Sequence, residues 1–423
     1  MLNLDFTGKV VIVTGAGGSL GKAYALEFAK RKAFVVVNDL GTSQDGSFAG
    51  RISAISTVAE IKFHGGSAVP SFDNVESGHK IVETAISHFG RIDVIVNNAG
   101  ILLDKAFQNM TDDDWDLVYK THVKGAYSVT KAAWPFFKKQ RYGRIIFTSS
   151  NSAVYGNFGQ ANYAAAKNAL VGLSHTLAIE GSRYGIKSNV IIPTASSRLT
   201  AQLFLEESLV LLKAEHVVPL VIYLGHDSCR ETGGVFEAGA GWYGQIQTYR
   251  SKGMVIPAAN AEAVVDNWSR ITDMTSAKHF GSIQEVTADL LNRAEQAGVS
   301  EAKWELEKEK KDEYMELSKV IAEELNWKRH DSLSSSLRFM LLLTNGVDVY
   351  SFTISFDGDR GPCERESVCV IAIHHDLFEE ILKGQLITEE IIRPGKLVIV
   401  GDIGEGNVIK CINQLAISMR PRL

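Results

Sequence analysis

The sequence contains no apolar run near the roughly 20 residues that span a bilayer, so we expect no membrane-spanning helix. Its start, MLNLDFTGKVVIVTG, lacks the charged segment, apolar segment and cleavage site of a secretion signal. The formal net charge is −5 with both signs intermixed, and no basic patch indicates a nucleic-acid partner. The four cysteines form no CxxC pair and are expected to be reduced, partly buried thiols; we assign no metal ligands (Cys229, Cys363, Cys369 and Cys411).

The length of 423 residues is too great for one ordinary domain. From residue 9 to residue 192, apolar β-branched runs alternate with helical patterns. The predicted strands are 9–14, 34–37, 68–72, 93–96, 144–148 and 187–192, and the predicted helices include 77–89, 112–139 and 161–184. Strands that are apolar throughout are buried on both faces, which predicts an α/β fold with a doubly wound parallel sheet.

The pattern changes after about residue 245. Segment 251–300 shows helical stretches and no strand, 301–325 is rich in Lys and Glu like a solvated helix, and 331–336 suits a linker. Strands at 350–356, 368–373 and 396–400 and helices at 377–382 and 407–416 then predict a small α+β domain. We therefore predict three parts: a dinucleotide-binding domain 1–250, a helical extension 251–305 and a C-terminal domain 306–423.

A glycine-rich loop, Thr14–Gly21, joins the first strand to the first helix. Glycines let the backbone turn tightly and approach a pyrophosphate, and the helix start behind them offers free N–H groups. A lone glycine-rich loop is weak evidence, but its place inside a βαβ unit makes it a dinucleotide signature. We assign cofactor contacts to four loop residues, Gly15, Ser19, Leu20 and Gly21.

Asp39 ends the second strand about 20 residues after the glycines, the place of an acid that binds the adenosine ribose. Its charge would repel the 2′-phosphate of NADP, and no Arg or Lys lies in the loop, so we predict NAD. The alternative is that Asp39 only forms the turn before Leu40 and Gly41. Further cofactor contacts are expected where later strands end, at Asn74, Val75, Asn98 and Ala195, and from Tyr163 and Lys167.

Tyr163 and Lys167 are four residues apart in a helical pattern, so they share one helix face. Oxidation of an alcohol needs a base, and tyrosine with a pKa near 10 is a poor one. A nearby ammonium is expected to lower that pKa, and Ser150, thirteen residues earlier at a strand end, can hold the substrate oxygen. We predict Ser150, Tyr163 and Lys167 as the catalytic set, because all three accompany the nucleotide loop.

These motifs, together with NNAG at 97–100 and a strand end at Pro193, resemble the short-chain dehydrogenase/reductase family. Stretches such as YGNFGQANYAAAK (155–167) and GGVFEAGAGWYG (233–244) look like the dehydrogenase part of type 2 peroxisomal multifunctional enzymes, or D-bifunctional proteins, over roughly residues 1–300. That resemblance implies an NAD-linked, dimeric (3R)-hydroxyacyl-CoA dehydrogenase of fatty acid β-oxidation. A hydroxysteroid or retinoid dehydrogenase shares the core motifs, and a lipid carrier with a scaffold dehydrogenase fold is the alternative outside enzymes.

The sequence departs from the family at three places. Ser19 stands at the usual third glycine of the loop. His122 aligns with a frequent catalytic Asn; we interpret it as positioning a water molecule or Lys167, the alternative being a packed polar residue. No NP-x-H hydratase signature follows, and the about 120 remaining residues are too few for that unit. A separate enoyl-CoA hydratase is therefore expected.

The last part of the chain shows two further resemblances. Residues 375–415 look like the C-terminal half of sterol carrier protein 2, which implies a tunnel for acyl chains or acyl-CoA. The final tripeptide Pro421-Arg422-Leu423 resembles the Ser-Lys-Leu peroxisomal address and implies a peroxisomal import receptor as partner.

Overall fold

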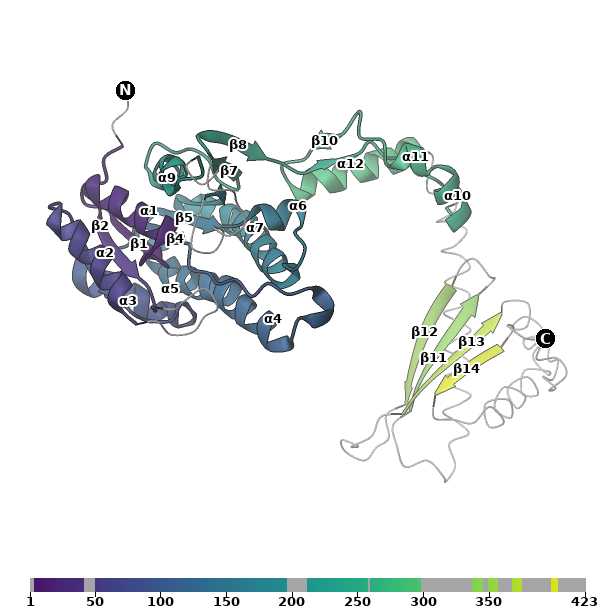
Figure 1. Cartoon of the computed structure of the whole chain (residues 1–423). Coiled ribbons are helices and arrows are strands. Elements are labelled where there is room, and N and C mark those ends of the chain that lie inside the picture. Colours follow the sequence, from purple (N-terminus) through teal and green to yellow (C-terminus); the bar gives the residue numbers. More distant parts are fainter. Residues whose placement is uncertain are drawn as a thin grey trace, which may run out of the picture. The chain divides into compact units, whose positions relative to one another are not determined.

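The computed structural model describes residues 4–41, 50–195, 211–257 and 259–297, and beyond these the backbone of four strands between residues 337 and 401. Its internal contacts divide the chain into two units, Met1–Tyr249 and Arg250–Leu423 (Figure 1). The predicted boundary at 305, the linker and the charge-rich segment 301–325 lie outside the described residues, as do the predicted helices 377–382 and 407–416.

The first unit is built on an eight-stranded sheet with the order β3-β2-β1-β4-β5-β6-β7-β8. The first seven strands run parallel, and β8 pairs antiparallel with β7. The predicted α/β fold with a doubly wound parallel sheet is confirmed. The strands are β1 (Val10–Thr14), β2 (Phe34–Asn38), β3 (Ser67–Ser71), β4 (Val94–Asn97), β5 (Gly143–Thr148), β6 (Ile186–Thr194), β7 (Val235–Gly239) and β8 (Trp242–Ile246).

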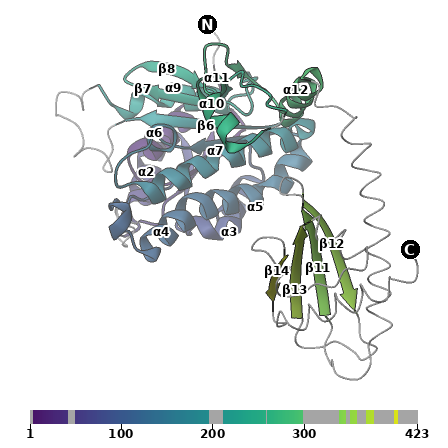
Figure 2. The same ribbon diagram turned by 90° about the vertical axis from the view of Figure 1, so that its right-hand side faces the viewer.

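Helices cover both faces of this sheet because its central strands are apolar on both sides. Every residue of β1, β4 and β5 is buried. One apolar cluster packs against α1 (Ser19–Lys30), α2 (Ile52–Phe63) and α9 (Val218–Gly225). The second packs against α3 (Gly78–Phe89), α5 (Gly125–Gln140) and α7 (Ala161–Gly181), which Figure 2 shows side by side. Two shorter helices, α4 (Asp112–Tyr119) and α6 (Asn151–Tyr155), complete the unit.

Three local differences from the sequence-based prediction concern helix and strand limits. The expected helix 112–139 is one continuous helical run, but its turn at Lys120–Lys124 is a π-helix between α4 and α5. The strand expected at 187–192 extends to Ile186–Thr194. The strands β7 and β8, of which β8 is the edge strand, were not predicted, since Glu237 and glycines interrupt the apolar pattern and β8 has exposed side chains.

The direction of strand order reverses at β1, whose neighbours are β2 and β4. Thr14 at the end of β1 pairs with Asn38 of β2, and Val13 pairs with Val96 of β4. The loops that follow these three strands therefore leave the sheet at one edge. Ligands of open α/β sheets bind at such a reversal point.

The second unit contains helices and two sheets. Three helices lie in 261–296: α10 (Ala261–Asp266), α11 (Trp268–Ile271) and α12 (Ile283–Gln296). Two-residue strands, β9 (Tyr249–Arg250) and β10 (Lys278–His279), pair with each other, so the prediction of no strand in 251–300 is wrong at 278–279. Arg250 forms an ion pair with Asp289 of α12.

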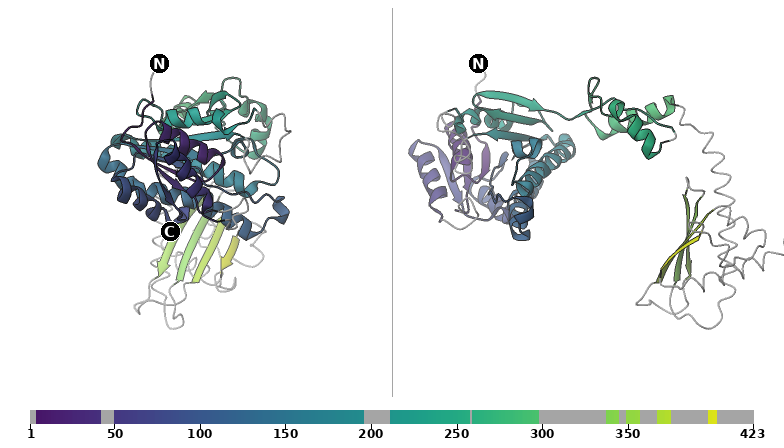
Figure 3. Two further views of the ribbon diagram at one scale, coloured as in Figure 1. Left: turned by 60° about the vertical axis from the view of Figure 1, so that its left-hand side comes forward. Right: turned by 45° about the vertical axis from the view of Figure 1, so that its right-hand side comes forward.

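The other sheet of this unit has the order β12-β11-β13-β14 and is seen close to edge-on on the right of Figure 3. Its strands are β11 (Leu337–Thr344), β12 (Val349–Phe356), β13 (Ser367–His374) and β14 (Leu397–Gly401). The strands predicted at 350–356, 368–373 and 396–400 are present within a residue at each end. β11, which lies between β12 and β13, was not predicted, although its sequence LRFMLLLT is strongly apolar.

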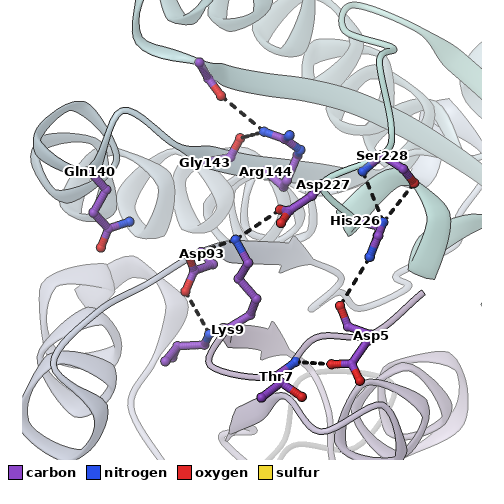
Figure 4. Close-up of polar contacts among 12 residues, drawn as sticks. Asp5, Thr7, Lys9, Asp93, Gln140, Gly143, Arg144, His226, Asp227 and Ser228 are labelled. Carbon is purple, nitrogen blue, oxygen red and sulfur yellow. Dashed lines mark hydrogen bonds and ion pairs between the residues drawn. The ribbon is translucent and has the colours of Figure 1, made fainter. Parts of the chain in front are cut away.

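A charged cluster ties together the amino ends of the central strands of the first unit (Figure 4). The Asp93 side chain, 0% exposed, accepts the Val10 N–H at 2.9 Å and two hydrogen bonds from Arg91 at 2.8 and 2.9 Å. The Lys9 ammonium lies 3.0 Å from Asp227 and 4.0 Å from Asp93. One buried carboxylate thus links the start of β1 to the start of β4.

We predict that Asp93→Asn destabilises the first unit, because the amide cannot accept all of these bonds and leaves Arg91 without its counter-charge, while Lys9 keeps Asp227. The expected loss in the free energy of unfolding is about 2 kcal/mol, since both cations keep contact with water. Urea unfolding of the full chain measures it. Asp116→Asn is the control: it removes an exposed i,i+4 pair with Lys120 and should leave the midpoint nearly unchanged. Equal midpoints for both variants would contradict the role of Asp93.

Candidate active site

A cavity of about 330 Å³ opens at the carboxyl edge of the sheet, at the strand reversal. All the site residues predicted from the sequence line it, and they come from the glycine loop with the start of α1, from the segments that follow β2, β3, β4, β5 and β6, and from α7. They are Gly15, Ser19, Leu20, Gly21, Asp39, Asn74, Val75, Asn98, Ser150, Tyr163, Lys167 and Ala195. His122 lines the same cavity. The fold therefore brings together residues that lie up to 180 positions apart in the chain (Ala195 − Gly15).

The glycine loop lies close against the loop that follows β4. A Cβ added at Gly15, whose φ is +64°, would lie 2.8 Å from the Ala99 Cα, and one at Gly21 would collide with the Gly15 carbonyl. The first turn of α1 begins after Gly18 with no side-chain cap, so its N–H groups are free to receive a ligand. Tight backbone and an uncapped helix start fit a dinucleotide pyrophosphate.

Ser19 adopts a φ of +46°, in the left-handed region that favours glycine. The serine therefore has a backbone conformation that glycine adopts without strain. A non-glycine residue in this region costs on the order of 1 kcal/mol, so the loop is strained at the first residue of α1.

Asp39 faces the glycine loop from the end of β2. One of its carboxylate oxygens accepts the Gly17 N–H at 2.8 Å, and the other accepts the Gly41 N–H at 2.7 Å. The Ser53 hydroxyl also donates to the second oxygen at 3.3 Å. The two interpretations of Asp39 are thus compatible, because it forms the turn at Gly41 and also stands at the wall of the cavity.

Asn98 joins the glycine loop to β4. Its side-chain amide donates to the Thr14 carbonyl at 3.0 Å, and its backbone N–H donates to the Thr14 hydroxyl at 3.0 Å. Asn74 uses its side-chain oxygen to accept the Glu76 N–H at 3.0 Å. Both residues line the cavity while their side chains hold the surrounding loops.

Ser150, Tyr163 and Lys167 line the same cavity as the glycine loop. Ser150 follows β5 and caps α6, with its hydroxyl oxygen accepting the Ser152 N–H at 3.2 Å. Tyr163 and Lys167 lie one turn apart on α7, and the Lys167 ammonium is 5.5 Å from the centre of the tyrosine ring. Lys167 is 3% exposed and donates to the Thr148 carbonyl at 2.7 Å. A backbone carbonyl of β5 thus fixes the lysine.

Burial governs the proton equilibria of this set. It raises the pKa of Tyr163 to about 12; the Ser150 hydroxyl lowers that pKa and the charge of Asp104 raises it further. Burial also lowers the pKa of Lys167 to about 7. The sequence-based expectation of a lowered pKa for Tyr163 is therefore not met here, because burial disfavours the charged form more than the Ser150 hydrogen bond favours it.

His122 lies in the π-helical turn, is 2% exposed, and packs edge-to-face on the Tyr163 ring at 5.3 Å. Its Nε2 is 3.1 Å from the Ile101 nitrogen and 2.9 Å from the Ile101 oxygen. Burial and the Lys167 charge hold the pKa of His122 well below its usual range, so the ring is neutral. Within the described part of the chain its Nδ1 has no hydrogen-bond partner.

The sequence analysis did not single out three polar residues beside this set: Asp104, Gln160 and Asn162. Gln160 is 4% exposed and donates to Asp104 at 2.7 Å, while Asn162 donates to the Leu103 carbonyl at 3.2 Å. Gln160 and Asn162 have one signal in the sequence, their position directly before Tyr163, whereas Asp104 has none. Across the described ranges, no group of three or more His, Cys, Asp or Glu side chains is placed to hold a metal ion. None of the described helices is long and apolar enough to cross a membrane.

Known proteins with similar sequences include peroxisomal enzymes. The chain is 50% identical over 304 residues to peroxisomal multifunctional enzyme type 2 of Mus musculus, an alignment that covers 70% of this chain and 41% of the mouse protein. It is 42% identical over 277 residues to a putative short-chain type dehydrogenase/reductase of Mycobacterium tuberculosis, covering 64% of this chain and 97% of that protein. The chain thus spans less than half of the mouse relative.

Solved structures agree with this. Full-length peroxisomal multifunctional enzyme type 2 of Drosophila melanogaster aligns with a TM-score of 0.60 and 42% identity, over 69% of this chain and 50% of the fly chain. A 7α-hydroxysteroid dehydrogenase in complex with NADH and 7-oxo glycochenodeoxycholic acid aligns with a TM-score of 0.51 and 26% identity, over 56% and 96% of the two chains.

The profile of the short chain dehydrogenase family matches residues 9–204, which include the glycine loop and the Ser150, Tyr163 and Lys167 set. The mycobacterial relative is matched over nearly its whole length. The chain belongs to the short-chain dehydrogenase/reductase family.

Proposed function

We propose that this chain is an NAD-dependent (3R)-3-hydroxyacyl-CoA dehydrogenase of peroxisomal fatty acid β-oxidation. The observation that carries the proposal is the meeting of Ser150, Tyr163 and Lys167 in the cavity that the glycine loop also lines. The names of the mouse and fly relatives support the compartment, and a 35% identical relative of Mycobacterium tuberculosis that is named a hydroxyacyl-CoA dehydrogenase supports the substrate class. The family supports an oxidoreductase with a nicotinamide cofactor, and a structural neighbour contains NADH.

In this proposal the chain supplies binding and proton transfer, and bound nicotinamide supplies the acceptor for the hydride. Ser150 holds the substrate oxygen against Tyr163, which takes up the hydroxyl proton. Because the pKa of Tyr163 lies near 12, its phenolate is scarce at neutral pH, and oxidation should become faster as pH rises. Lys167, with a pKa of about 7, exchanges protons near neutrality and can pass on the proton that Tyr163 receives.

The direct test is NAD reduction by the full chain against (3R)- and (3S)-hydroxyacyl-CoAs of varied length and a set of hydroxysteroids. We expect NADH formation with the (3R) thioesters. Turnover of steroids alone would favour the hydroxysteroid alternative. The structural similarity to a 7α-hydroxysteroid dehydrogenase is the reason to test that alternative. Acyl-CoA binding without any NADH formation would favour the lipid carrier.

Tyr163→Phe should lower kcat by the upper part of the roughly 10²–10⁴ range that general acid–base groups contribute. NADH affinity, followed by its fluorescence, should stay within about twofold because the phenyl ring keeps its packing. Tyr223→Phe, the same change on α9, is the matched control and should leave kcat unchanged. Activity of Tyr163→Phe within a factor of two of the wild type would refute the assignment.

The preference for NAD rests on Asp39. Asp39→Asn keeps an oxygen for the Gly41 N–H and removes the charge, and adding Leu40→Arg at the cavity wall supplies a phosphate partner. The ratio of kcat/KM for NADP to that for NAD should rise by at least about tenfold in the double variant, and less in Asp39→Asn alone. A wild-type enzyme that prefers NADP would show that the interpretation of Asp39 is wrong.

We also propose a homodimer formed through α4 and α7, which pack against each other. The surface of α4 exposes Trp115 and Tyr119, which lie one turn apart, and α7 exposes Ile179 beside small residues at Ala169 and Gly172. A surface of this kind is typical of an interface between subunits.

Ala169→Glu should therefore shift the mass measured by analytical ultracentrifugation from dimer to monomer, because a charge would be buried without a partner. The control is Ile55→Glu, which places the same charge at a 52% exposed residue of α2 on the opposite face of the sheet. A dimer that survives Ala169→Glu and is lost in Ile55→Glu would place the interface elsewhere.

Three finer predictions remain part of this proposal. A separate enoyl-CoA hydratase supplies the substrate, and residues 306–423 form a lipid-binding domain like sterol carrier protein 2. The third is that an import receptor binds Pro421–Leu423. That tripeptide lies outside the described residues, as does most of the C-terminal domain apart from its four strands.

A further inference from the structure

The loop Ile101–Ala106, which follows β4, forms part of the cavity wall through Ile101 and Leu102. It contains no helix or strand, yet hydrogen bonds hold it at almost every residue. Beside the contact of Ile101 with His122, the Lys105 N–H donates to the Gly159 carbonyl at 2.9 Å. Side chains of the segment just before Tyr163 hold Leu103 and Asp104. The loop is therefore fixed against the same segment that presents the tyrosine.

Gln160 is the centre of this attachment. Its side-chain oxygen accepts the Ser152 hydroxyl at 2.6 Å and the Asn157 amide at 3.0 Å, and its side-chain nitrogen donates to Asp104 at 2.7 Å. Ser152 in turn donates its backbone N–H to Ser150. A buried amide with three partners has one orientation, so a continuous chain of hydrogen bonds runs from Asp104 to Ser150.

We propose that Asp104 and Gln160 are positioning residues of the dehydrogenase reaction: Gln160 fixes the loop wall relative to Ser150 and Tyr163, and Asp104, which accepts the Gln160 amide at 2.7 Å, anchors that amide and carries one negative charge on the loop. This inference rests on the proposed function of Tyr163 as the proton acceptor. Neither residue needs to touch the reacting atoms, because each acts through a residue that does.

The charge of Asp104 has a defined effect on Tyr163. Lys167 lies on the same helix as the tyrosine, neutral His122 packs on its ring from the π-helical turn, and Ser150 interacts with its hydroxyl from the end of β5, while Asp104 acts on it from the loop through charge alone. Asp104 is the anion among them, and it raises the pKa of Tyr163. Removing its charge makes the phenolate easier to form, so alcohol oxidation reaches its plateau at lower pH.

The test is the pH profile of kcat/KM for oxidation in Asp104→Asn, which removes the charge and keeps an oxygen for Gln160. We expect the rising limb to move to lower pH by about 0.5 unit at low ionic strength. Because Asp104 is exposed, 0.5 M salt should shrink the shift, which a merely structural change would not do. Asp114→Asn, which removes the partner of Lys105, is the control and should not move the limb.

Gln160→Leu tests whether Gln160 fixes the loop wall, since leucine fills similar space without hydrogen bonds. We expect KM for the acyl substrate to rise and kcat to fall, together lowering kcat/KM by about tenfold or more, while NADH affinity is unchanged. The proposal is overturned if Asp104→Asn leaves the limb within 0.1 pH unit at low salt, or if Gln160→Leu keeps kcat/KM within twofold.

A measurement without substrate separates this inference from the proposed function. The absorbance of ionised tyrosine near 295 nm, compared between each chain and its Tyr163→Phe counterpart, follows Tyr163 alone. Asp104→Asn should advance the appearance of this signal to lower pH even if no hydroxyacyl-CoA is turned over. An unchanged titration would refute the role of Asp104, whereas an inactive chain with the expected titration would refute only the substrate assignment.

Discussion

The close approach of two loops at the strand reversal is the constraint on which the rest of the site depends. The glycine loop and the loop after β4 touch at Gly15 and Ala99, where only glycine fits, and the Asn98 amide bridges them. The first loop is suited to a dinucleotide, and the second continues into the cavity wall at Ile101. His122 and Gln160 then attach that wall to α7. A continuous series of backbone and side-chain contacts thus connects the proposed nucleotide site to Tyr163.

The same close packing sets the proton chemistry. Removing water from Lys167 and Tyr163 disfavours the charged form of each. The pKa of Lys167 therefore falls toward neutrality, and the pKa of Tyr163 rises further above it. The sequence shows the spacing of the two residues but not the depth at which they lie. A spacing argument therefore predicts a lowered tyrosine pKa, while the folded chain has a raised one. The polar groups around the ring, Ser150 and Asp104, adjust that value from opposite directions.

Much of the fold and the site could be predicted because both depend on local patterns. Apolar β-branched strands, the loop at Thr14–Gly21, and the Tyr163 and Lys167 spacing are visible within short windows of sequence. The Asp104–Gln160 contact joins residues 56 positions apart and has no periodic signal, so only the folded chain reveals it. β8 was missed for a different reason: it is an edge strand with exposed Trp242 and Tyr243, which lack the apolar run of a buried strand.

The amino and carboxyl edges of the sheet contribute differently to the stability of the first unit. At the amino edge, Asp93 satisfies the start of β1 and neutralises Arg91 and Lys9, so this edge adds stability. At the carboxyl edge, Ser19 is held at a positive φ and α1 begins without a side-chain cap. Both features cost stability in the chain by itself, and a bound anion at the helix start would offset them. The loop that we propose for cofactor binding can remain strained at one edge because the opposite edge of the same strands is fixed by ion pairs.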